Sequence, residues 1–435
     1  MTVTEFLHNE VVDFASYSTM RAIASLVDGF KNGGRKVAYT VMKRPDKDTK
    51  VSILAGIIAI ETEYLHGDIS GSVVTMAKNY AGTNNIPLLT REGNFGTRFE
   101  PEASANRYIF TAKDKVFDKI FNKIDNNILI EQEFEGTNIE PRFYVPNLPM
   151  ILINGSEGIA TGFAQKILSR NPADIKSYIT AKLAGQAPVA IKPWFNGFNG
   201  SVSQGETTNQ WIIDGTFKRT SLTRLLITEL PIGQNLTSYT KVLDDLEDKK
   251  KIKGYSDLSE EDVFKFEVQL SSVDMKKDDE WLLKELKLTK KVSENYTVLD
   301  ENNRVVIYTS PEEIIDHYIR VKLDYTQKRK DYLIQKLKDD ALVLASKYIF
   351  IKNVTDGVIL VNKKKKDEII SQIKTINNII EVDGSFEYLL RMPIYSLTEE
   401  KMAELKEQIM NKKQELKEIE SKEINSIWLE EMNVC

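Results

Sequence analysis

The sequence predicts a mostly helical α+β fold in three parts. The first observation is a helix–turn–helix pattern followed by a glycine-tipped hairpin, which predicts a winged helix over residues 1–125. The second is a mixture of helical and strand-like runs over residues 126–310. The third is a pair of long stretches with coiled-coil spacing over residues 311–435. A chain of 435 residues is long enough for two or three domains with cores of their own.

The helix–turn–helix pattern lies between residues 50 and 78. Apolar residues at helical spacing predict one helix over residues 50–64 and a second, shorter helix over residues 69–78. Between them, Gly67 suits a tight turn and Asp68 suits an N-cap. The second helix of such a unit lies in a DNA groove. His66 at its mouth can bond a phosphate, although a structural capping role is equally expected of this histidine taken alone.

The middle part alternates between helix and strand signals. Residues 126–144 form a polar connector, and the apolar run 149–153 predicts a buried strand that enters a glycine-rich turn. That turn has no Gly-Lys-Ser/Thr ending, which excludes a nucleotide-binding loop. Asn171-Pro172 predicts the start of a helix reaching about Leu183. Residues 202–232 are β-like, and residues 298–308 predict a strand, a turn and a strand.

The C-terminal part predicts two long helices that run in opposite directions. Ser310-Pro-Glu-Glu313 is a capping box with proline at the first helical position. Between the helices, residues 354–397 must form a small helical knob, and the lysines 363–366 are expected at a solvated corner. Apolar residues recur at steps of three and four in both helices: Ile334, Leu337, Ala341, Leu344, Tyr348 and Ile351 in the first, and Met402, Leu405, Ile409, Leu416 and Ile419 in the second.

Composition excludes several classes of protein. The single cysteine, Cys435, and three histidines exclude a disulfide framework and a Cys/His zinc site. This cysteine usage favours a reducing compartment. No apolar run reaches 18 residues, so we expect a soluble, intracellular protein. The net charge of −5 argues against a DNA-coating protein but permits a local DNA groove.

One segment carries the opposite charge from the rest of the chain. Residues 21–50 hold eight Lys/Arg against three Asp, a local net charge of +5, which indicates a polyanion site. Lys31, Arg35 and Lys36 are the candidates for contacts with phosphates. Glycines 29, 33 and 34 allow a close approach of the backbone to a phosphate. For such a stretch taken alone, a solvated basic loop is the more common meaning.

The pair Arg107-Tyr108 is the candidate catalytic centre. A tyrosine is a poor nucleophile at neutral pH because its phenol pKa is about 10. An adjacent guanidinium stabilises the phenolate and neutralises a bound phosphate, which an attack on phosphorus requires. Most Arg-Tyr pairs are surface pairs without a function. The motifs at fixed distances on either side give this pair its meaning.

Several motifs follow one another in a fixed order: Arg21-Ala-Ile-Ala with Asp28-Gly-Phe-Lys31, His66-Gly67-Asp68, Gly93-Asn94-Phe95-Gly96, Arg107-Tyr108, Asn154-Gly-Ser-Glu-Gly-Ile159-Ala, Pro193-Trp-Phe-Asn-Gly-Phe-Asn-Gly200 and Ile227-Thr-Glu-Leu-Pro231. From about residue 14 to about residue 425 the chain resembles the DNA-cleaving subunit of type IIA topoisomerases. Its size and early stop look most like the medium subunit of the T-even-type phage enzyme, whereas the cleaving subunit of a bacterial gyrase continues into a further β-rich domain.

The resemblance implies a role for each motif residue. Tyr108 attacks a backbone phosphorus and forms a 5′-phosphotyrosyl bond, while Arg107 neutralises the scissile phosphate. Arg21 and His66 are both candidates for assisting proton removal or departure of the leaving group, and the sequence does not choose between them. The DNA-binding residues implied are Lys31, Arg35, Lys36, Asn94 and Ile159, of which Ile159 wedges between base pairs and bends the duplex.

The resemblance also implies an assembly. The middle part corresponds to the family's tower, and the helical hairpin corresponds to a stalk whose tip forms a homodimer and the exit gate for a transported duplex. Mg²⁺ and ATP are bound by partner subunits that carry the ATPase and the TOPRIM domain. The whole is an ATP-dependent type II topoisomerase that passes double-stranded DNA through a transient break, here in the cytoplasm of a bacterium infected by phage.

Two departures from the family pattern affect the phosphate contacts. The family's Pro-Val-His after the lysine is Asn32-Gly33-Gly34 here, which removes a histidine, and the first histidine of His-x-His-Gly-Asp is Tyr64, which offers a hydroxyl instead. The alternative function is a non-cleaving, winged-helix DNA-binding or architectural protein. The feature that separates the two is the intact pair Arg107-Tyr108. A coiled-coil scaffold protein leaves the order of the motifs unexplained.

Overall fold

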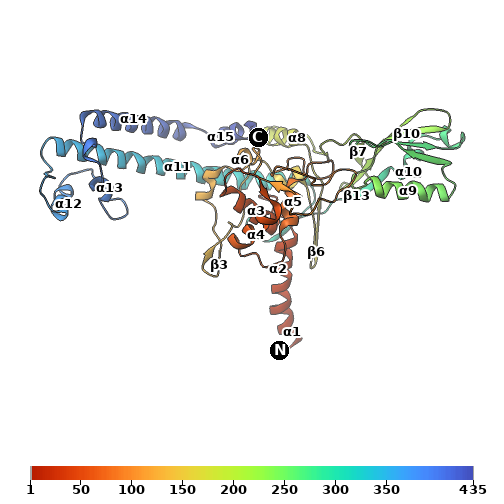
Figure 1. Cartoon of the computed structure of the whole chain (residues 1–435), viewed down its shortest axis with the longest axis horizontal. Coiled ribbons are helices and arrows are strands. Elements are labelled where there is room, and N and C mark those ends of the chain that lie inside the picture. The colour runs from red at the N-terminus through yellow and green to blue at the C-terminus, as the bar shows by residue number, and fades with distance from the viewer. Residues whose placement is uncertain (1, 435) are drawn as a thin grey trace. The chain divides into compact units, whose positions relative to one another are not determined.

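The computed structural model describes residues 2–434, which form two compact units. The first unit holds the residues up to Lys322 together with those from Leu429 onward, and the second holds Leu323–Trp428. The predicted winged-helix and mixed regions both lie in the first unit, and most of the predicted helical hairpin lies in the second (Figure 1). None of the helices among the described residues has the length and apolar character needed to cross a membrane.

The first unit begins with a helix that projects from its body (Figure 1). It consists of α1 (Val3–Phe6), the π-helical turn η1 (Leu7–Val11) and α2 (Val12–Ala22). The side chains of α1 and η1 are not buried, and burial starts only near the end of α2. The chain then enters the core at residues 23–27. The end of α2 therefore stands at the boundary between the projecting helix and the packed core.

Three helices and a small β-ladder follow. The helices predicted over residues 50–64 and 69–78 are present as α4 (Val51–Glu61) and α5 (Ser70–Ala77), next to α3 (Asn32–Met42). Strand β1 (Thr49–Lys50) pairs antiparallel with β2 (Phe110–Thr111). The carboxylate of Asp68 accepts a hydrogen bond from the Ser70 N–H at 2.9 Å, although the N-cap of α5 is Ile69, one residue later than predicted.

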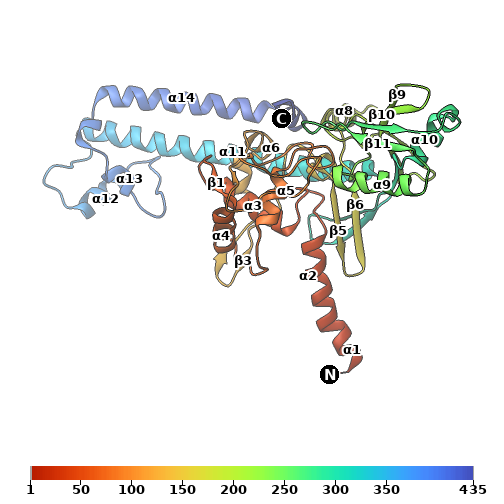
Figure 2. The ribbon, with the colours of Figure 1, turned by 45° about the vertical axis from the view of Figure 1, so that its right-hand side comes forward.

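The apolar run 149–153 is a helix and not the strand that the sequence predicted. It forms α7 (Met150–Asn154), whose four apolar side chains are all buried. A run this short and this apolar fits a buried strand and a buried helical turn equally well, because neither leaves a polar face. Strands β5 (Ser156–Ala160) and β6 (Phe163–Ile167) then form an antiparallel hairpin that projects from the same side of the unit as α2 (Figure 2).

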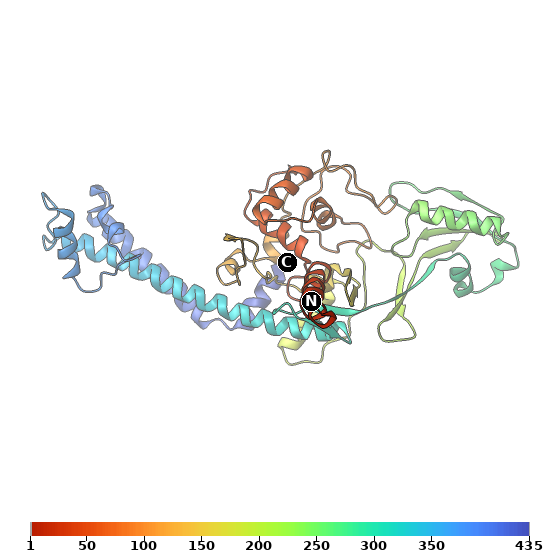
Figure 3. The same ribbon diagram turned by 90° about the horizontal axis from the view of Figure 1, so that it is seen from below.

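The mixed region contains the strands expected for residues 202–232 and 298–308. Strands β7 (Ser201–Gln204), β8 (Gln210–Asp214) and β13 (Thr289–Ser293) form one antiparallel sheet in the order β13-β8-β7. A second antiparallel sheet has the order β11-β12-β10-β9 and is covered by α9 (Figure 3). Its strands are β9 (Thr216–Arg219), β10 (Arg224–Glu229), β11 (Gly254–Asp257) and β12 (Phe266–Gln269), with the helices α9 (Leu236–Asp248) and α10 (Asp279–Glu285).

The core of this second sheet follows from period-two alternation. Leu225 and Ile227 on β10 point to the same face as Phe266 and Val268 on β12, and all four are buried. Tyr239, Leu243 and Leu246 of α9, spaced by four and three residues, pack against them. The predicted cap Asn171 does accept a hydrogen bond from Ala173, and it starts α8 (Pro172–Leu183). The remaining short elements are α6 (Phe117–Ile120), η2 (Lys123–Asn127), β3 (Glu133–Phe134), β4 (Thr137–Asn138), η3 (Asp274–Lys276), β14 (Tyr296–Leu299) and β15 (Val305–Tyr308).

The longest helix, α11 (Pro311–Thr355), starts at the predicted capping box. The Glu313 N–H donates to the Ser310 hydroxyl at 3.4 Å, as predicted. The Glu313 carboxylate, however, accepts from the N–H and the hydroxyl of Thr309, at 2.9 and 2.8 Å. The reciprocal half of the capping box is thus made one residue before the position that the sequence pattern indicated.

The second unit is built from the later part of α11 and from α14 (Glu399–Ser421), which run antiparallel (Figure 3). Lys338 pairs with the Glu420 carboxylate at 3.3 Å, and the Lys330 ammonium donates to the Glu420 carbonyl at 3.0 Å. Between the two helices, residues 354–397 form the predicted helical knob, whose buried Ile359, Ile373, Phe386 and Leu389 pack against Phe350 of α11. Its elements are α12 (Lys366–Lys374), α13 (Glu387–Leu390) and η4 (Ile394–Ser396), and α15 (Ile424–Val434) ends the described chain.

Candidate active site

Tyr108 is an exposed tyrosine beside a cation. Its side chain is 65% exposed, and the Arg107 guanidinium lies 4.7 Å from the centre of its ring. Among residues 2–434 no group forms a hydrogen bond with its phenol. The hydroxyl is therefore open to a group from outside the chain, with a positive charge next to it.

The backbone around Tyr108 is fixed to the start of α4. This helix has no side-chain N-cap, so its first N–H groups need other acceptors. The Val51 N–H donates to the Ile109 carbonyl at 3.0 Å, and the Ser52 N–H donates to the Asn106 carbonyl at 3.2 Å. Because Ile109 is itself buried, the loop is held on both sides of the tyrosine while the ring of Tyr108 stays exposed.

A cavity of about 360 Å³ gathers other predicted site residues. It is lined by Arg21, Lys31, Lys36, Tyr64 and His66 together with Tyr17, and the acidic residues Glu63 and Glu140 also line it. The Tyr17 ring lies 5.2 Å from the His66 ring and 5.7 Å from the Arg21 guanidinium, between centres. The structure thus brings the two candidates for proton transfer into one cationic, aromatic pocket. Tyr108 is not among the residues that line it.

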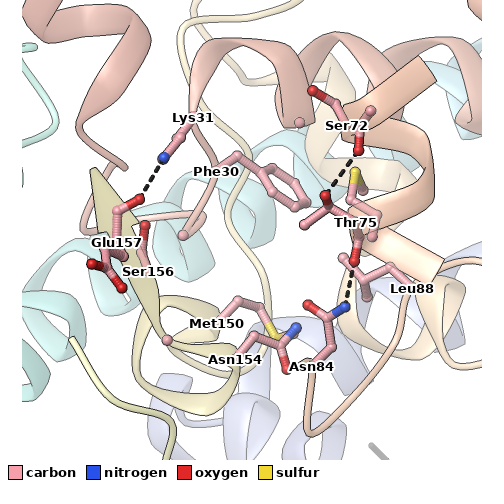
Figure 4. A pocket seen from close by; sticks show the side chains of 15 residues that line it. Phe30, Lys31, Ser72, Thr75, Asn84, Leu88, Met150, Asn154, Ser156 and Glu157 are labelled. Atoms are coloured by element: carbon pink, nitrogen blue, oxygen red, sulfur yellow. Dashed lines mark hydrogen bonds between the residues drawn. The ribbon is translucent and has the colours of Figure 1, made fainter. Parts of the chain in front are cut away.

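Lys31 lies between this pocket and a second cavity of about 350 Å³ between α5 and β5 (Figure 4). Its ammonium donates to the Glu157 carbonyl at 2.6 Å, which leaves two N–H donors for other acceptors. Burial lowers the pKa of Lys31, and the Glu157 carboxylate opposes this shift. Ser72, Thr75 and Asn84 are among the polar residues that line the second cavity, and Figure 4 shows the Asn84 amide turned toward Thr75, to whose carbonyl it donates at 2.6 Å.

Arg35 and Lys36 are less available to a phosphate than their place in the sequence suggested. Both side chains are buried, and each already has an acidic partner. Arg35 forms a bidentate pair with Asp28 at 2.8 and 3.2 Å. Lys36 donates to the Glu140 carboxylate at 3.0 Å and to the Thr62 carbonyl at 2.5 Å. Their charges stabilise the fold through these ion pairs. The net charge of the segment therefore overstates the number of cations that are available to a polyanion.

The glycines of this segment also serve internal packing. A Cβ at Gly29, which has φ of +73°, would lie 2.5 Å from the Ile151 nitrogen. A Cβ at Gly33 would lie 2.8 Å from the Ser72 hydroxyl on α5. At Gly29 and Gly33 the backbone comes close to α7 and α5 of the same chain.

Ile159 stands on the β5–β6 hairpin with 83% of its side chain exposed. The preceding Gly158 explains how the hairpin is seated, because a Cβ there would lie 2.0 Å from the Ala22 carbonyl oxygen. The hairpin thus rests on the end of α2, one residue after Arg21. Asn94 is exposed, and its side-chain oxygen accepts from the Gly96 N–H at 2.8 Å, which shapes the glycine turn before the tyrosine loop.

A family model that describes the A subunit of DNA gyrase and topoisomerase IV matches residues 21–433, nearly the whole chain. The chain belongs to this family. The resemblance drawn from the motifs is thereby confirmed at the level of a type IIA topoisomerase cleavage domain. The match covers every predicted site residue, from Arg21 to Ile159.

Type II topoisomerases from several organisms are similar to this chain in sequence and structure. The mitochondrial DNA topoisomerase 2 of Dictyostelium discoideum is 32% identical over 98% of this chain and 34% of its own length. DNA topoisomerase 2 of Acanthamoeba polyphaga mimivirus is 30% identical over 99% of this chain and 40% of its own length. The chain therefore spans about a third of the length of these relatives. A crystal structure of the Plasmodium falciparum topoisomerase II DNA-binding, cleavage and re-ligation domain superposes with a TM-score of 0.90 at 31% identity, over 99% of this chain and 63% of that one.

The resemblance implies that Mg²⁺ is bound by a partner subunit. Within the described residues no three His, Cys, Asp or Glu side chains gather where they could hold a metal ion. Two carboxylates near the pocket, Asp28 and Glu140, are buried and paired with Arg35 and Lys36.

Sequence reasoning missed two residues that organise the site. Arg98 is buried and donates to the carbonyls of Ala81 and Leu230 at 3.0 and 2.7 Å, which ties the loop after the glycine turn to the end of β10. Asn106 bonds Ser70 on α5 through its side chain. The partners of Arg98 and Asn106 lie far away in the sequence, so no local pattern indicates either contact.

Proposed function

We propose that this chain cleaves and rejoins DNA as part of an ATP-dependent type IIA topoisomerase. The observation that carries the proposal is the exposed Tyr108, which stands beside Arg107 on a loop fixed to the start of α4. Membership of the family supports it.

In the proposed reaction the Tyr108 oxygen attacks a backbone phosphorus of DNA. A phosphorus–oxygen bond forms to the tyrosine as the bond to the 3′-oxygen breaks, so the 5′ end becomes attached to the protein. The phenol loses its proton and the departing 3′-oxygen gains one, which leaves a 3′-hydroxyl. One phosphodiester replaces another, and resealing by the reverse step needs no ATP. Arg107 offsets the charge that develops on the phosphate.

The pocket of Arg21, Lys31 and His66 is proposed to bind phosphates next to the scissile bond. Tyr108 of the same chain does not line this pocket, and we propose that a second copy supplies its Tyr108 to it. Arg21 and His66 both lie in this pocket, and both remain candidates for proton transfer. Ile159 at the exposed hairpin is proposed to wedge between base pairs, because it is a large apolar side chain directed to solvent.

We propose that partner subunits and a second copy of this chain complete the active complex. Mg²⁺ and ATP are assigned to a TOPRIM- and ATPase-bearing partner. A homodimer is proposed to form through the knob of the second unit. The likeness to the medium subunit of the T-even-type phage enzyme stays a prediction, and so does a place in the host cytoplasm.

The decisive test is Tyr108→Phe in the complex with the partner subunits. We expect covalent capture of DNA by denaturant to be abolished and DNA affinity to change less than twofold, since the ring remains and only the nucleophile is lost. Tyr332→Phe, on α11, is the matched control and should behave as wild type. Covalent capture by Tyr108→Phe would reject the proposed nucleophile. A wild-type complex that binds DNA without any capture would favour the non-cleaving alternative.

A further inference from the structure

The side chain of Asn106 joins the tyrosine loop to the first turn of α5. Its Nδ2 donates to the Ser70 hydroxyl at 2.6 Å and approaches the Asp68 carboxylate at 3.4 Å. The Ser70 hydroxyl in turn donates to Asp68, which also accepts from the Ser70 N–H at 2.9 Å. An amide, a hydroxyl and a carboxylate thus form a continuous chain of hydrogen bonds.

The roles of the donors in this chain are fixed by chemistry. Ser70 is buried, and its single hydroxyl proton goes to Asp68. The hydroxyl oxygen can then only accept, and Asn106 supplies the donor. The Asn106 main-chain carbonyl accepts from the Ser52 N–H of α4 at 3.2 Å. Asn106 is consequently held by α4 through its main chain and by α5 through its side chain.

This arrangement determines where Tyr108 stands. Among the described residues the phenol has no hydrogen-bond partner, and Arg107, which lies against its ring, belongs to the same loop. The position of the tyrosine therefore follows from the backbone that carries it. That backbone is anchored at Asn106 and at Ile109, on either side of the tyrosine. Of these anchors, the Asn106 amide is the one that reaches α5 and the turn that follows His66.

We propose that Asn106 is a positioning residue for Tyr108, and this inference rests on the proposed cleavage function. Its amide holds the tyrosine loop against the start of α5, so that the nucleophile keeps its place relative to the helix that is proposed to meet DNA. Asn106 itself contacts neither DNA nor the reacting atoms. Its loss lets the loop shift while the fold and the DNA surface stay intact.

The test compares Asn106→Ala, Ser70→Ala and the double variant in the complex with the partner subunits. We expect the rate of covalent capture at saturating DNA to fall about tenfold to a hundredfold in Asn106→Ala, since a displacement of about 1 Å costs up to that much. DNA affinity and melting temperature should stay at wild-type values. Asn127→Ala removes an amide that donates to the Ile124 carbonyl in η2, away from the site, and is the matched control.

The double variant decides whether the amide acts through Ser70. If it does, removing both groups costs no more than removing the more damaging one, because the two share one interaction. Fully additive losses would overturn the chain of bonds as the cause. A fall in DNA affinity with an unchanged rate would show that Asn106 binds DNA instead, and a wild-type rate would reject the proposal outright. Tyr108→Phe, run beside them, tests the cleavage function separately.

Discussion

At the scale of single residues, burial decides which cations of residues 21–50 can meet a polyanion. Arg35 and Lys36 are enclosed with Asp28 and Glu140, so their charges are already neutralised within the fold. Lys31 is only partly buried, and its ammonium donates one hydrogen bond, to the Glu157 carbonyl. A count of charges along the sequence treats these three residues alike, whereas Lys31 is more available to a polyanion than Arg35 and Lys36.

The first prediction concerns Lys31. Lys31→Met should lower DNA affinity at low salt and reduce the slope of log K against log [salt] by about 0.9, the contribution of one phosphate contact. Binding titrations at several salt concentrations measure this slope. Lys43→Met removes a cation of the same segment that is exposed and stacks on Tyr39 at 3.6 Å, and it is the control. A normal slope for Lys31→Met would place the phosphate elsewhere.

The second prediction concerns the buried pair Asp28–Arg35. Asp28→Asn keeps the shape of the side chain but leaves the Arg35 guanidinium without a counter-charge, and the same carboxylate also accepts from the N–H groups of Phe30 and Tyr144. We expect the free energy of unfolding to fall by about 3–5 kcal/mol, the usual cost of breaking a buried pair from one side. Urea unfolding measures it.

The control for that experiment is Asp13→Asn, an exposed carboxylate of α2, which should change the unfolding free energy by less than about 0.5 kcal/mol. The salt slope of DNA binding should be the same in Asp28→Asn and wild type as long as the protein is folded. A stable Asp28→Asn protein with weakened DNA binding would mean that this pair belongs to the DNA surface after all.

At the scale of elements, the sequence predicts best where a periodic pattern is long. The helices α4, α8, α11 and α14 were all predicted, because each has either a repeated apolar spacing or a cap whose bonds the structure confirms. Residues 149–153 show the opposite case. A run of five residues without a polar one shows no alternation from which the type of element could be predicted. A segment buried on all sides can form a helical turn as readily as a strand.

The third prediction tests how the β5–β6 hairpin is seated. In Gly158→Ala the new Cβ would meet the Ala22 carbonyl oxygen at 2.0 Å, so the hairpin must move away from α2 and carry Ile159 with it. We expect DNA bending, followed by fluorescence energy transfer between the ends of a duplex, to fall along with the cleavage rate. DNA affinity should fall by a smaller factor.

Gly56→Ala is the matched control for this change, because its Cβ would meet nothing within 4 Å on the surface of α4. It should leave the bend unchanged and stabilise the protein by roughly 0.5–1 kcal/mol, as alanine does in place of glycine within a helix. An unchanged bend in Gly158→Ala would show that the hairpin does not set the DNA path.

At the scale of the whole molecule, the order of motifs predicted the family, but it did not predict which residues meet. The Arg21, Lys31 and His66 pocket forms from segments that the motifs had marked, so this part of the site was foreseeable. The pairing of Lys36 with Glu140, 104 residues away, was not. Contacts over such distances depend on how complete elements pack, and a single sequence carries no local signal for them.

The last prediction concerns the proposed dimer, which would form through the knob of the second unit. Val358 and Leu360 there are exposed by 57% and 55%, and Tyr395 by 80%, although each is large and apolar or aromatic. A twofold interface uses each side chain twice. With about 1.5–3 kcal/mol for each buried leucine, Leu360→Asp removes about 3–6 kcal/mol, a loss of roughly 10²–10⁴ in dimer affinity.

Sedimentation at micromolar concentration should therefore show Leu360→Asp as a monomer and wild type as a dimer. Met410→Asp is the control, because Met410 is equally exposed, at 63%, on α14 but lies outside the knob. It should remain a dimer. If both variants dimerise, the copies meet through another surface. If both become monomers, the contact extends along α14, and the proposed exit gate would have to include the helical pair as well as its tip.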